Sequence, residues 1–449
     1  MSKRRWGSLD VMSRRPTAPF YTVAAALFVL LVASNMPTPL YAVYRERFGF
    51  SSAVLTLIFA TYAVVLVPSL LLFGQLSDRL GRRRVIAVGL GVAMLGLALF
   101  AAARGTAWLF AARAVQGLSV GAITGAATAG LVELEPDGDR QRAALLSVLA
   151  QAGGCAVGPL TAGVLAQWAP EPRVLCYVVA LIVIAATCVA ALSIPEPAQA
   201  SGRWEIQRPS VPSAIRVGFA RASLTGAAVW AVAALFLSVV PSYAAKLLDT
   251  DDLALLGAIA ATMLATSCLT QWLAAGRASL HAQPTGLAVL ACGLVALVLA
   301  FPLHSLPIVL AAALLAGAGH GLAFLGAQTE VNHIAPPERR GEVTAAFMSC
   351  IYGGVAVSVI GVGVISSSAQ SLFTAVAAFA AAIGATAVLT AGWHLARRAG
   401  RARAPPGPAA PAPPRRGCLR RRAGRSPRRR TRGGRRRSGP TRPAPTARR

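Results

Sequence analysis

The chain has 449 residues and combines an apolar composition with a large positive charge. It contains 55% hydrophobic and 13% charged residues, with a mean hydropathy of +0.59 and a formal net charge of +28. Soluble domains carry about 25% charged residues, so a single water-soluble globule is excluded. The seven cysteines are scattered, without a CxxC pair or a neighbouring His at metal spacing, which argues against a disulfide framework or a zinc site.

The positive charge is concentrated at the C-terminus. Residues 397–449 contain 20 Arg and no Asp or Glu, which leaves a net charge of +8 for the rest of the chain. Arg, Pro and Gly make up 37 of these 53 residues, a composition that cannot form a packed core. We therefore expect a disordered tail. It could bind anionic lipid, bind nucleic acid, or be idle, and part of it could be a frameshift or extension product.

Apolar runs that are long enough to cross a membrane fill the rest of the chain. A transmembrane helix needs about 20 mostly apolar residues. Twelve runs qualify, namely 20–43, 53–75, 85–103, 107–132, 144–167, 174–194, 219–245, 253–275, 285–302, 306–330, 343–365 and 371–394. Their composition is typical of helices packed in lipid and not of a barrel. The first run follows basic residues, as a signal peptide does, but it lacks a clear cleavage site and is expected to be retained.

The basic residues between the runs predict the orientation of the chain. With a cytoplasmic N-terminus, the external segments hold five, namely Arg45, Arg47, Arg104, Arg173 and Lys246. The cytoplasmic segments then hold eighteen before the tail, namely Lys3, Arg4, Arg5, Arg14, Arg15, Arg79, Arg82, Arg83, Arg84, Arg140, Arg142, Arg203, Arg208, Arg216, Arg221, Arg277, Arg339 and Arg340. By the positive-inside rule, both termini are expected to be cytoplasmic in a multi-pass protein of the inner (plasma) membrane.

The twelve runs divide into two halves of six. A polar, Pro-containing segment between them is expected to be a cytoplasmic linker. When the chain is shifted by 200 residues, Gly117 and Gly121 align with Gly317 and Gly321, and loop Pro and Arg residues align as well. Duplicated halves are typical of secondary transporters. The expected parts are the N-terminus (1–19), two six-helix bundles (20–194 and 219–396), the linker (195–218) and the tail (397–449).

The segment between the second and third runs carries the most specific motif. It reads Gly74-Gln75-Leu76-Ser77-Asp78-Arg79-Leu80-Gly81-Arg82-Arg83-Arg84 and resembles the signature loop of the major facilitator superfamily, G-x-L-a-D-r-x-G-r-r. The glycines permit a tight turn, and the carboxylate can pair with arginines or face a helix N-terminus. The resemblance implies a twelve-helix transporter whose halves are latched by Gly74, Asp78, Arg79, Gly81, Arg82 and Arg83. The matching loop of the second half lacks the Asp.

A second motif places a charge inside the fourth run. Arg113-Ala114-Val115-Gln116-Gly117 resembles the superfamily signature R-x-x-q-G. An arginine about 10 Å from the end of its helix costs several kcal/mol unless it lines a cavity or is paired. The resemblance implies proton coupling or substrate binding, and the alternative is a snorkelling or structural arginine. The first run has no carboxylate, so the remaining candidates for these roles are Gln116, His320 and Glu330, although a lone His is also compatible with simple hydrogen bonding.

Small residues in the fifth run form a third motif. Gly154-Cys155-Ala156-Val157-Gly158-Pro159-Leu160-Thr161-Ala162-Gly163 resembles g-x-x-x-G-P-x-x-G, which in the superfamily marks exporters, especially proton-driven antiporters. Small residues four apart allow close helix packing, and a proline bends the helix. The residues expected in packing and gating are Gly117, Gly121, Gly154, Gly158, Pro159 and Gly163. A G-x-S-x-G match at Gly117–Gly121 is not a hydrolase motif, because it lies within a span.

The expected cavity is mainly apolar. Its predicted lining residues are Asn35, Tyr41, Gln151, Trp230, Tyr243, Phe324 and Gln328. We expect a secondary transporter, neither an enzyme nor dependent on a cofactor or metal, that exports small lipophilic or amphipathic compounds in exchange for protons and works as a monomer in lipid. The alternatives are a symporter that imports an organic solute and a membrane-anchored protein that binds lipid or nucleic acid through its tail, although no specific nucleic acid is expected.

Overall fold

Apolar helices joined by short polar loops form the part of the chain that the computed structural model describes. The described residues are 17–171, 173–196, 210–276, 281–336, 339–368 and 371–403. Their helices are α1 (Thr17–Asn35), α2 (Pro37–Phe48), α3 (Ser52–Leu80), α4 (Arg82–Ala101), α5 (Thr106–Leu134), α6 (Arg140–Trp168), α7 (Leu175–Ser193), η1 (Ser213–Ile215), α8 (Arg216–Ser238), α9 (Val240–Leu248), α10 (Leu253–Ala274), α11 (Ala282–Leu303), α12 (Leu306–Ile334), α13 (Arg340–Ser368) and α14 (Leu372–Arg403). Twelve segments of these residues can cross a membrane, which confirms the expected number.

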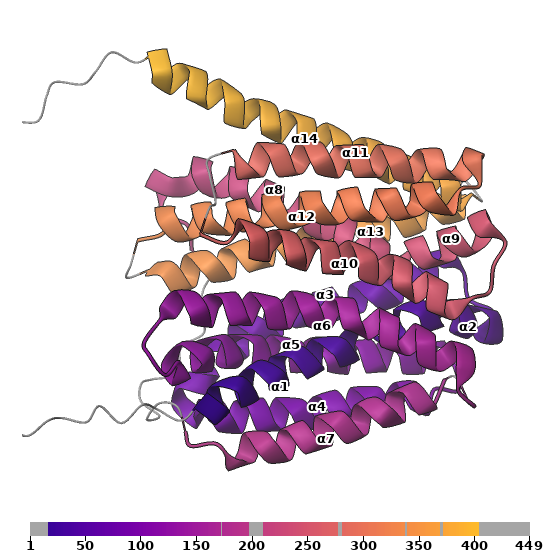
Figure 1. Cartoon of the computed structure of the whole chain (residues 1–449), viewed down its shortest axis with the longest axis horizontal. Helices are drawn as coiled ribbons and strands as arrows, with labels where there is room; N and C mark the ends of the chain where they lie inside the picture. The colour runs from indigo at the N-terminus through magenta and orange to yellow at the C-terminus, as the bar shows by residue number, and fades with distance from the viewer. Residues whose placement is uncertain are drawn as a thin grey trace, which may run out of the picture. The chain divides into compact units, whose positions relative to one another are not determined.

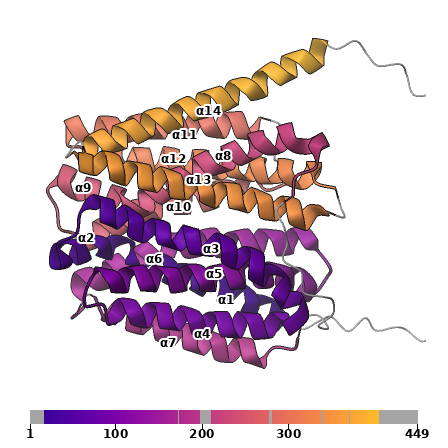
Figure 2. The same cartoon turned by 180° about the vertical axis from the view of Figure 1, so that it is seen from behind.

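The helices form two bundles (Figures 1 and 2). In the first, α5 packs against α3 and α4, and α1 packs against α6; in the second, α12 packs against α10 and α11, and α13 against α8. The bundles meet along two seams, α6 with α10 and α3 with α13. A shift of 200 residues converts α3 into α10 and α6 into α13, so the two seams are formed by equivalent helices. These helices belong to one compact unit that ends at Ala399.

Each bundle begins with a broken span. α1 ends at Asn35 and α2 begins at Pro37, where the sequence predicted an interruption. α8 gives way to α9 at Val239, two residues before Pro241. Proline has no backbone N–H, so a proline after a helix leaves one of its carbonyls without the usual donor. α2 and α9 contact each other. We call the end of the bundles that they form the α2/α9 end.

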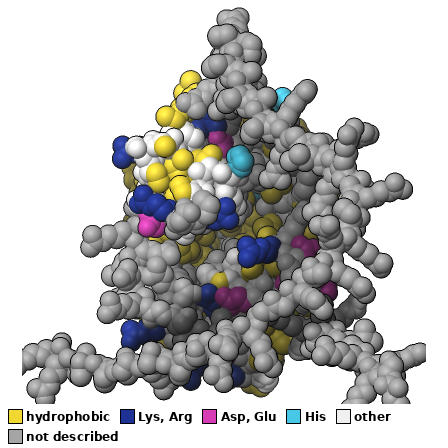
Figure 3. Space-filling model, turned by 90° about the vertical axis from the view of Figure 1, so that its left-hand side faces the viewer, with side chains coloured by type: hydrophobic (Ala, Val, Ile, Leu, Met, Phe, Trp, Pro, Cys, Tyr) yellow, Lys and Arg dark blue, Asp and Glu magenta, His cyan; other side chains and the backbone are white. Residues whose placement is uncertain are grey.

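Arginines gather at the opposite end, which we call the basic end. Its described arginines are Arg79, Arg82, Arg83, Arg84, Arg140, Arg142, Arg216, Arg221, Arg339 and Arg340. Figure 3 looks onto this end and shows basic and acidic side chains near one another, with hydrophobic side chains between them. Ion pairs join neighbouring helices here, such as Arg82 with Glu133 at 3.1 Å. That this end faces the cytoplasm stays a prediction.

Large apolar side chains are exposed along the outer faces of the spans. Ile182 and Val189 on α7 are each 65% exposed, and Leu389 on α14 is 74% exposed. Exposed apolar surface of this extent marks a membrane contact, because acyl chains accept it without cost. The same feature explains why the runs in the sequence are apolar on all sides. The N-terminal residues 1–16, linker residues 197–209 and tail residues 404–449 lie outside the described residues.

Candidate functional site

The break after α1 supplies acceptors for a buried arginine. The last carbonyls of a helix lack partners inside it, and Pro37 removes the donor that would otherwise serve Ala33. Gln116 Nε2 donates to the Ala33 carbonyl oxygen at 3.3 Å. Arg113 Nη1 donates to the Ser34 carbonyl oxygen at 2.9 Å. Two polar side chains one turn apart on α5 therefore satisfy the carbonyls that the break in α1 exposes.

Arg113 is enclosed by the first bundle. The residue is 2% exposed, its Nη1 also donates to Gln116 Oε1 at 3.0 Å, and its Nε donates to the Tyr41 hydroxyl. The guanidinium carbon lies 5.2 Å from the ring centroid of Phe59 and 5.6 Å from that of Tyr62, which suits cation–π attraction. No carboxylate among the described residues pairs with Arg113. Dipoles and aromatic rings, and not an opposite charge, stabilise this cation.

The second bundle carries an aromatic group around His320. The centroid of the Trp230 ring lies 5.3 Å from that of His320, 5.6 Å from that of Phe324 and 6.4 Å from that of Tyr352. The four residues come from α8, α12 and α13. The structure thus brings together three residues that the sequence had singled out separately. Tyr352 was missed, because an aromatic residue within an apolar run carries no local mark.

One ring nitrogen of His320 has a hydrogen-bond partner among the described residues, and the other has none. Its Nδ1 lies 2.7 Å from Ser267 Oγ, which also accepts from Gln271 Nε2 at 3.2 Å. His320 Nε2 and Trp230 Nε1 are buried and have no hydrogen-bond partner within the described part of the chain. A buried polar group without a partner costs about 1–3 kcal/mol. Two such groups 5.3 Å apart, measured between ring centroids, mark a place where a solute can supply the missing bonds.

Two tyrosines lie beside these groups on the helices of one seam. Tyr62 on α3 lies against Arg113, and Tyr352 on α13 lies against Trp230. Both tyrosines are half-buried, and α3 packs against α13. These polar and aromatic side chains form a set that occupies helices of both bundles. We call this set the central cluster, which consists of Arg113, Tyr62, Tyr352, Trp230, Phe324 and His320.

The glycines of the fifth-span motif permit close approaches of α6 to its neighbours. A Cβ atom at Gly154 or Gly158 would lie 2.5 Å from a carbonyl oxygen of α1. One at Gly163 would collide with the carbonyl oxygen of Leu253 on α10, in the other bundle. The motif therefore holds α6 against both the broken span and the seam. Gly117 on α5 has a similar part within the first bundle, because its Cβ would lie 2.5 Å from a carbonyl oxygen of α3.

The second seam repeats the contact of the first. A Cβ atom at Gly363 on α13 would collide with Thr56 and lie 3.2 Å from the Cα of Ala53 on α3. Gly363 corresponds to Gly163, and Ala53 to Leu253, at the offset of 200 residues. The same positions of the two halves thus form both seams. Gly363 was not among the residues predicted for packing and gating, because no Gly-Pro motif surrounds it.

The signature loop connects α4 to the rest of the first bundle. Arg82 pairs with Glu133 on α5 at 3.1 Å. Gly81 has a φ of +95°, and a Cβ there would lie 2.6 Å from the carboxylate of Glu196. Glu196 Oε1 accepts the backbone N–H of Arg83 at 3.1 Å. A carboxylate at this N-terminus of α4 is favoured by the partial positive charge of the helix.

Glu196 is a carboxylate at a helix N-terminus that the sequence did not predict. It was missed because it lies 113 residues from its partner and just after α7, where no local pattern points to it. The surroundings of Gly74 and the side chain of Asp78 lie outside what the structure describes, and Arg79 is exposed. The part of this loop in latching the halves stays a prediction.

Glu330, a predicted coupling residue, belongs to the basic end. It forms an ion pair with Arg221 of α8, and its Oε2 accepts from Gln283 Nε2 of α11 at 2.6 Å. The two charged side chains are 14% and 17% exposed. The pair therefore ties three helices of the second bundle together, as the Arg82–Glu133 pair ties two helices of the first.

Other residues predicted for the cavity have partners of their own. Asn35 Nδ2 donates to a carbonyl oxygen of its own helix at 2.8 Å and lies 3.4 Å from a sulfur of α6. The Tyr243 hydroxyl donates to the Leu297 carbonyl oxygen at 3.0 Å. Gln151 bonds within its own helix, and Gln328 is half-buried on α12. No hydrogen bond, ion pair or ring contact between described residues links any of these four to the central cluster.

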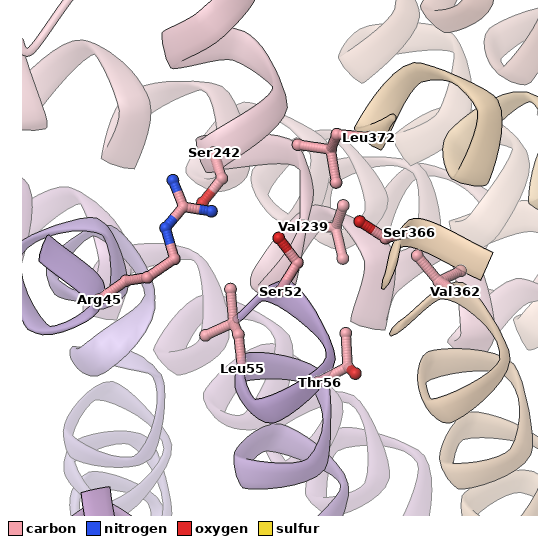
Figure 4. A pocket seen from close by; sticks show the side chains of 9 residues that line it. All are labelled: Arg45, Ser52, Leu55, Thr56, Val239, Ser242, Val362, Ser366 and Leu372. Carbon is pink, nitrogen blue, oxygen red and sulfur yellow. The ribbon is translucent and has the colours of Figure 1, made fainter. Parts of the chain in front are cut away.

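A small cavity lies between the bundles at the α2/α9 end. Its volume is about 10 Å³, and it is lined by Arg45, Ser52, Leu55, Thr56, Val239, Ser242, Val362, Ser366 and Leu372. Figure 4 shows the Arg45 guanidinium from α2 beside Ser242 from α9. Such a volume holds about one water molecule. A solute in the central cluster therefore has no open path through this cavity.

Twelve apolar spans in two bundles, with a polar and aromatic cluster between them, define a multi-pass membrane transporter and not an enzyme. The family model described as Major Facilitator Superfamily matches residues 23–359 and 284–430. The chain belongs to this superfamily. It is accordingly a secondary transporter of small-molecule substrates.

The chain is similar to a resistance protein over part of its length and to two solved transporter structures over most of its length. The puromycin resistance protein pur8 of Streptomyces alboniger is 35% identical over 168 residues, which are 37% of this chain and 31% of that protein, so the match spans about a third of the relative. A variant of the nucleoside transporter NupG has a TM-score of 0.62 at 15% identity, and the human organic anion transporter MFSD10 (TETRAN) has 0.61 at 17%. Both matches cover 84% of this chain and 99% of the other chain.

Proposed function

We propose that the protein exports small lipophilic or amphipathic compounds across the inner (plasma) membrane in exchange for protons. The observation that carries the proposal is the central cluster, because it brings aromatic rings and unpartnered buried polar atoms together inside the second bundle. Such a surface suits an aromatic solute better than a sugar or a phosphate ester. The basic end faces the cytoplasm, and alternating access exposes the cluster to one side at a time.

Two features support export. The fifth-span glycines, which resemble the exporter motif, contact both the broken span and the opposite bundle at Gly163. The relative that shares 35% identity over part of its length is a resistance protein, and resistance is consistent with export of the toxic compound. Import of an organic solute is the alternative.

We assign the proton-coupling step to the imidazole of His320, which forms no ion pair with any described residue. Its Nε2 is buried and unpartnered within the described residues, whereas Glu330 is engaged by Arg221 and Gln283. Arg113 contributes a fixed charge, since an arginine keeps its proton in proteins.

Transport in inverted membrane vesicles tests direction and coupling together. With an acid interior, vesicles containing the protein should accumulate the neutral dye Nile red, and a protonophore should abolish the accumulation. His320→Gln should lose the response to the pH gradient and keep dye exchange at equal pH. Accumulation by right-side-out vesicles instead would identify an importer.

The tail provides a test of the alternative from another class. Removing residues 404–449, which follow α14, should leave export unchanged, because the seams and the central cluster lie within residues 17–403. The measurement is the initial rate of dye uptake by inverted vesicles at matched protein level. If the shortened protein loses transport, or if its main defect is a loss of nucleic-acid binding, the protein acts through its tail.

A further inference from the structure

The free polar atoms of the central cluster are both hydrogen-bond donors. Ser267 Oγ accepts from Gln271 and lies 2.7 Å from His320 Nδ1. No other acceptor for the Ser267 hydroxyl proton occurs among the described residues, so Ser267 donates to Nδ1 and the ring proton of neutral His320 is on Nε2. Trp230 Nε1 is a donor in every state. A solute that satisfies both atoms must present an acceptor.

The walls of this site are flat and aromatic. The Phe324 ring meets the Trp230 ring edge to face at 86°, and Tyr352 is tilted against Trp230 by 41°. Trp230 and Tyr352 are half-buried, whereas Phe324 is 8% exposed. Part of each of Trp230 and Tyr352 is accessible, and a planar ring can stack on such aromatic side chains.

The buried charge of the described spans is positive. Each carboxylate side chain that the structure describes lies in a loop or within about one turn of a helix end. The deepest, Glu330, is engaged by Arg221. Arg113 lies about two turns inside α5 and has no acidic partner in the described structure. Its field in a low-dielectric interior attracts anions and repels cations.

We propose that the central cluster binds a planar aromatic anion, such as an aromatic carboxylate. The carboxylate accepts from Trp230 Nε1–H and His320 Nε2–H, the ring stacks on Trp230 and Tyr352, and the charge of Arg113 disfavours an amine of the same shape. This inference rests on the proposed transport function and names the class of solute. It adds a discrimination by charge, which amphipathic character alone does not imply.

Equilibrium binding of three matched naphthalene compounds tests this. The full chain in lipid nanodiscs is titrated by calorimetry with 2-naphthoate, 2-naphthamide and 2-naphthylmethylamine, which share a ring and differ in charge. We expect 2-naphthoate to bind on the order of tenfold more tightly than the amine, with the amide between them. Trp230→Phe keeps the ring and removes the donor, so it should weaken 2-naphthoate by about tenfold and leave the amine unchanged.

A matched control and a defined failure complete the test. Trp272→Phe alters a tryptophan on α10 that is 51% exposed, and it should change none of the three affinities. Binding of the amine as tight as that of 2-naphthoate would overturn the proposal, as would unchanged 2-naphthoate binding by Trp230→Phe. These measurements need no gradient, so they stand apart from the vesicle assays. A failure of export leaves them unaffected.

Discussion

The two bundles share one fold but use their buried polar groups differently. In the first bundle, Arg113 and Gln116 complete the hydrogen bonding of α1 at its break, and Arg113 is surrounded by rings. In the second, Trp230 Nε1 and His320 Nε2 have no partner among the described residues. The first bundle therefore holds a permanent charge in a closed network. The second leaves two buried donors unpaired, and we propose that they bind the solute.

This difference separates two tasks that a transporter must combine. A fixed cation needs rigid partners, because an unpaired buried charge would destabilise the bundle. A binding site needs polar groups whose bonds can be exchanged between protein, water and solute. We propose that each bundle performs one of these tasks. The half-buried Tyr62 and Tyr352 lie on α3 and α13, which form one seam between the bundles.

Arg113→Ala should have the largest effect, because it destroys the closed network. The change removes the interior charge and leaves the Ser34 carbonyl and the Tyr41 hydroxyl without the donor, at about 1–3 kcal/mol for each unpaired group. We expect gradient-driven export to fall more than tenfold while the protein still inserts. Vesicle transport at matched membrane levels measures this. Arg113→Lys, which keeps the charge without the planar fork, should retain part of the activity, and wild-type export by the alanine variant would refute the assignment.

Gly163→Leu and Gly363→Leu should have the next largest effects, and their effects should be similar. Each places a side chain where a Cβ already collides with the helix across the seam. Close packing at the α2/α9 end should be lost, and transport should fall severalfold in both. Accessibility of a cysteine introduced at Ser242 to a membrane-impermeant thiol reagent, in a background without native cysteines, reports the opening of this end.

Gly361→Leu provides the control on the same helix, because a Cβ at Gly361 meets nothing within 4 Å. This variant should transport normally and keep the α2/α9 end closed. A strong defect in only one of the two seam variants would show that the seams, although built alike, differ in function.

Glu330→Gln and Glu133→Gln should have the smallest effects on the protein. Together they allow a comparison of the two ion pairs at the basic end. Removing Glu330 leaves Arg221 partly buried without its partner, so we expect a loss of about 1–2 kcal/mol. Glu133 is 27% exposed against 17% for Glu330, and its removal should cost less. Thermal unfolding in nanodiscs measures both. Loss of the pH-gradient response in Glu330→Gln alone would move the coupling step from His320 to Glu330.

Local sequence patterns predicted the spans and the first break. The length of an apolar run and the position of a proline each affect the structure of a single helix, so both can be read from neighbouring residues. They did not predict Glu196 at the N-terminus of α4 or Tyr352 beside Trp230, since these contacts join distant segments. The second seam was not predicted for another reason. No Gly-Pro motif surrounds Gly363, so its local sequence does not separate its close backbone contact from the open position at Gly361.

The repeated seam has a consequence for the symmetry of the chain. Gly163 meets Leu253, and Gly363 meets Ala53, so position 163 of each half contacts position 53 of the other. A contact in which residue i meets residue j and j meets i is isologous, the mark of a twofold dimer. A rotation that exchanges the two bundles would therefore also exchange the two seams. The two halves of this single chain pack against each other as the subunits of a twofold dimer do.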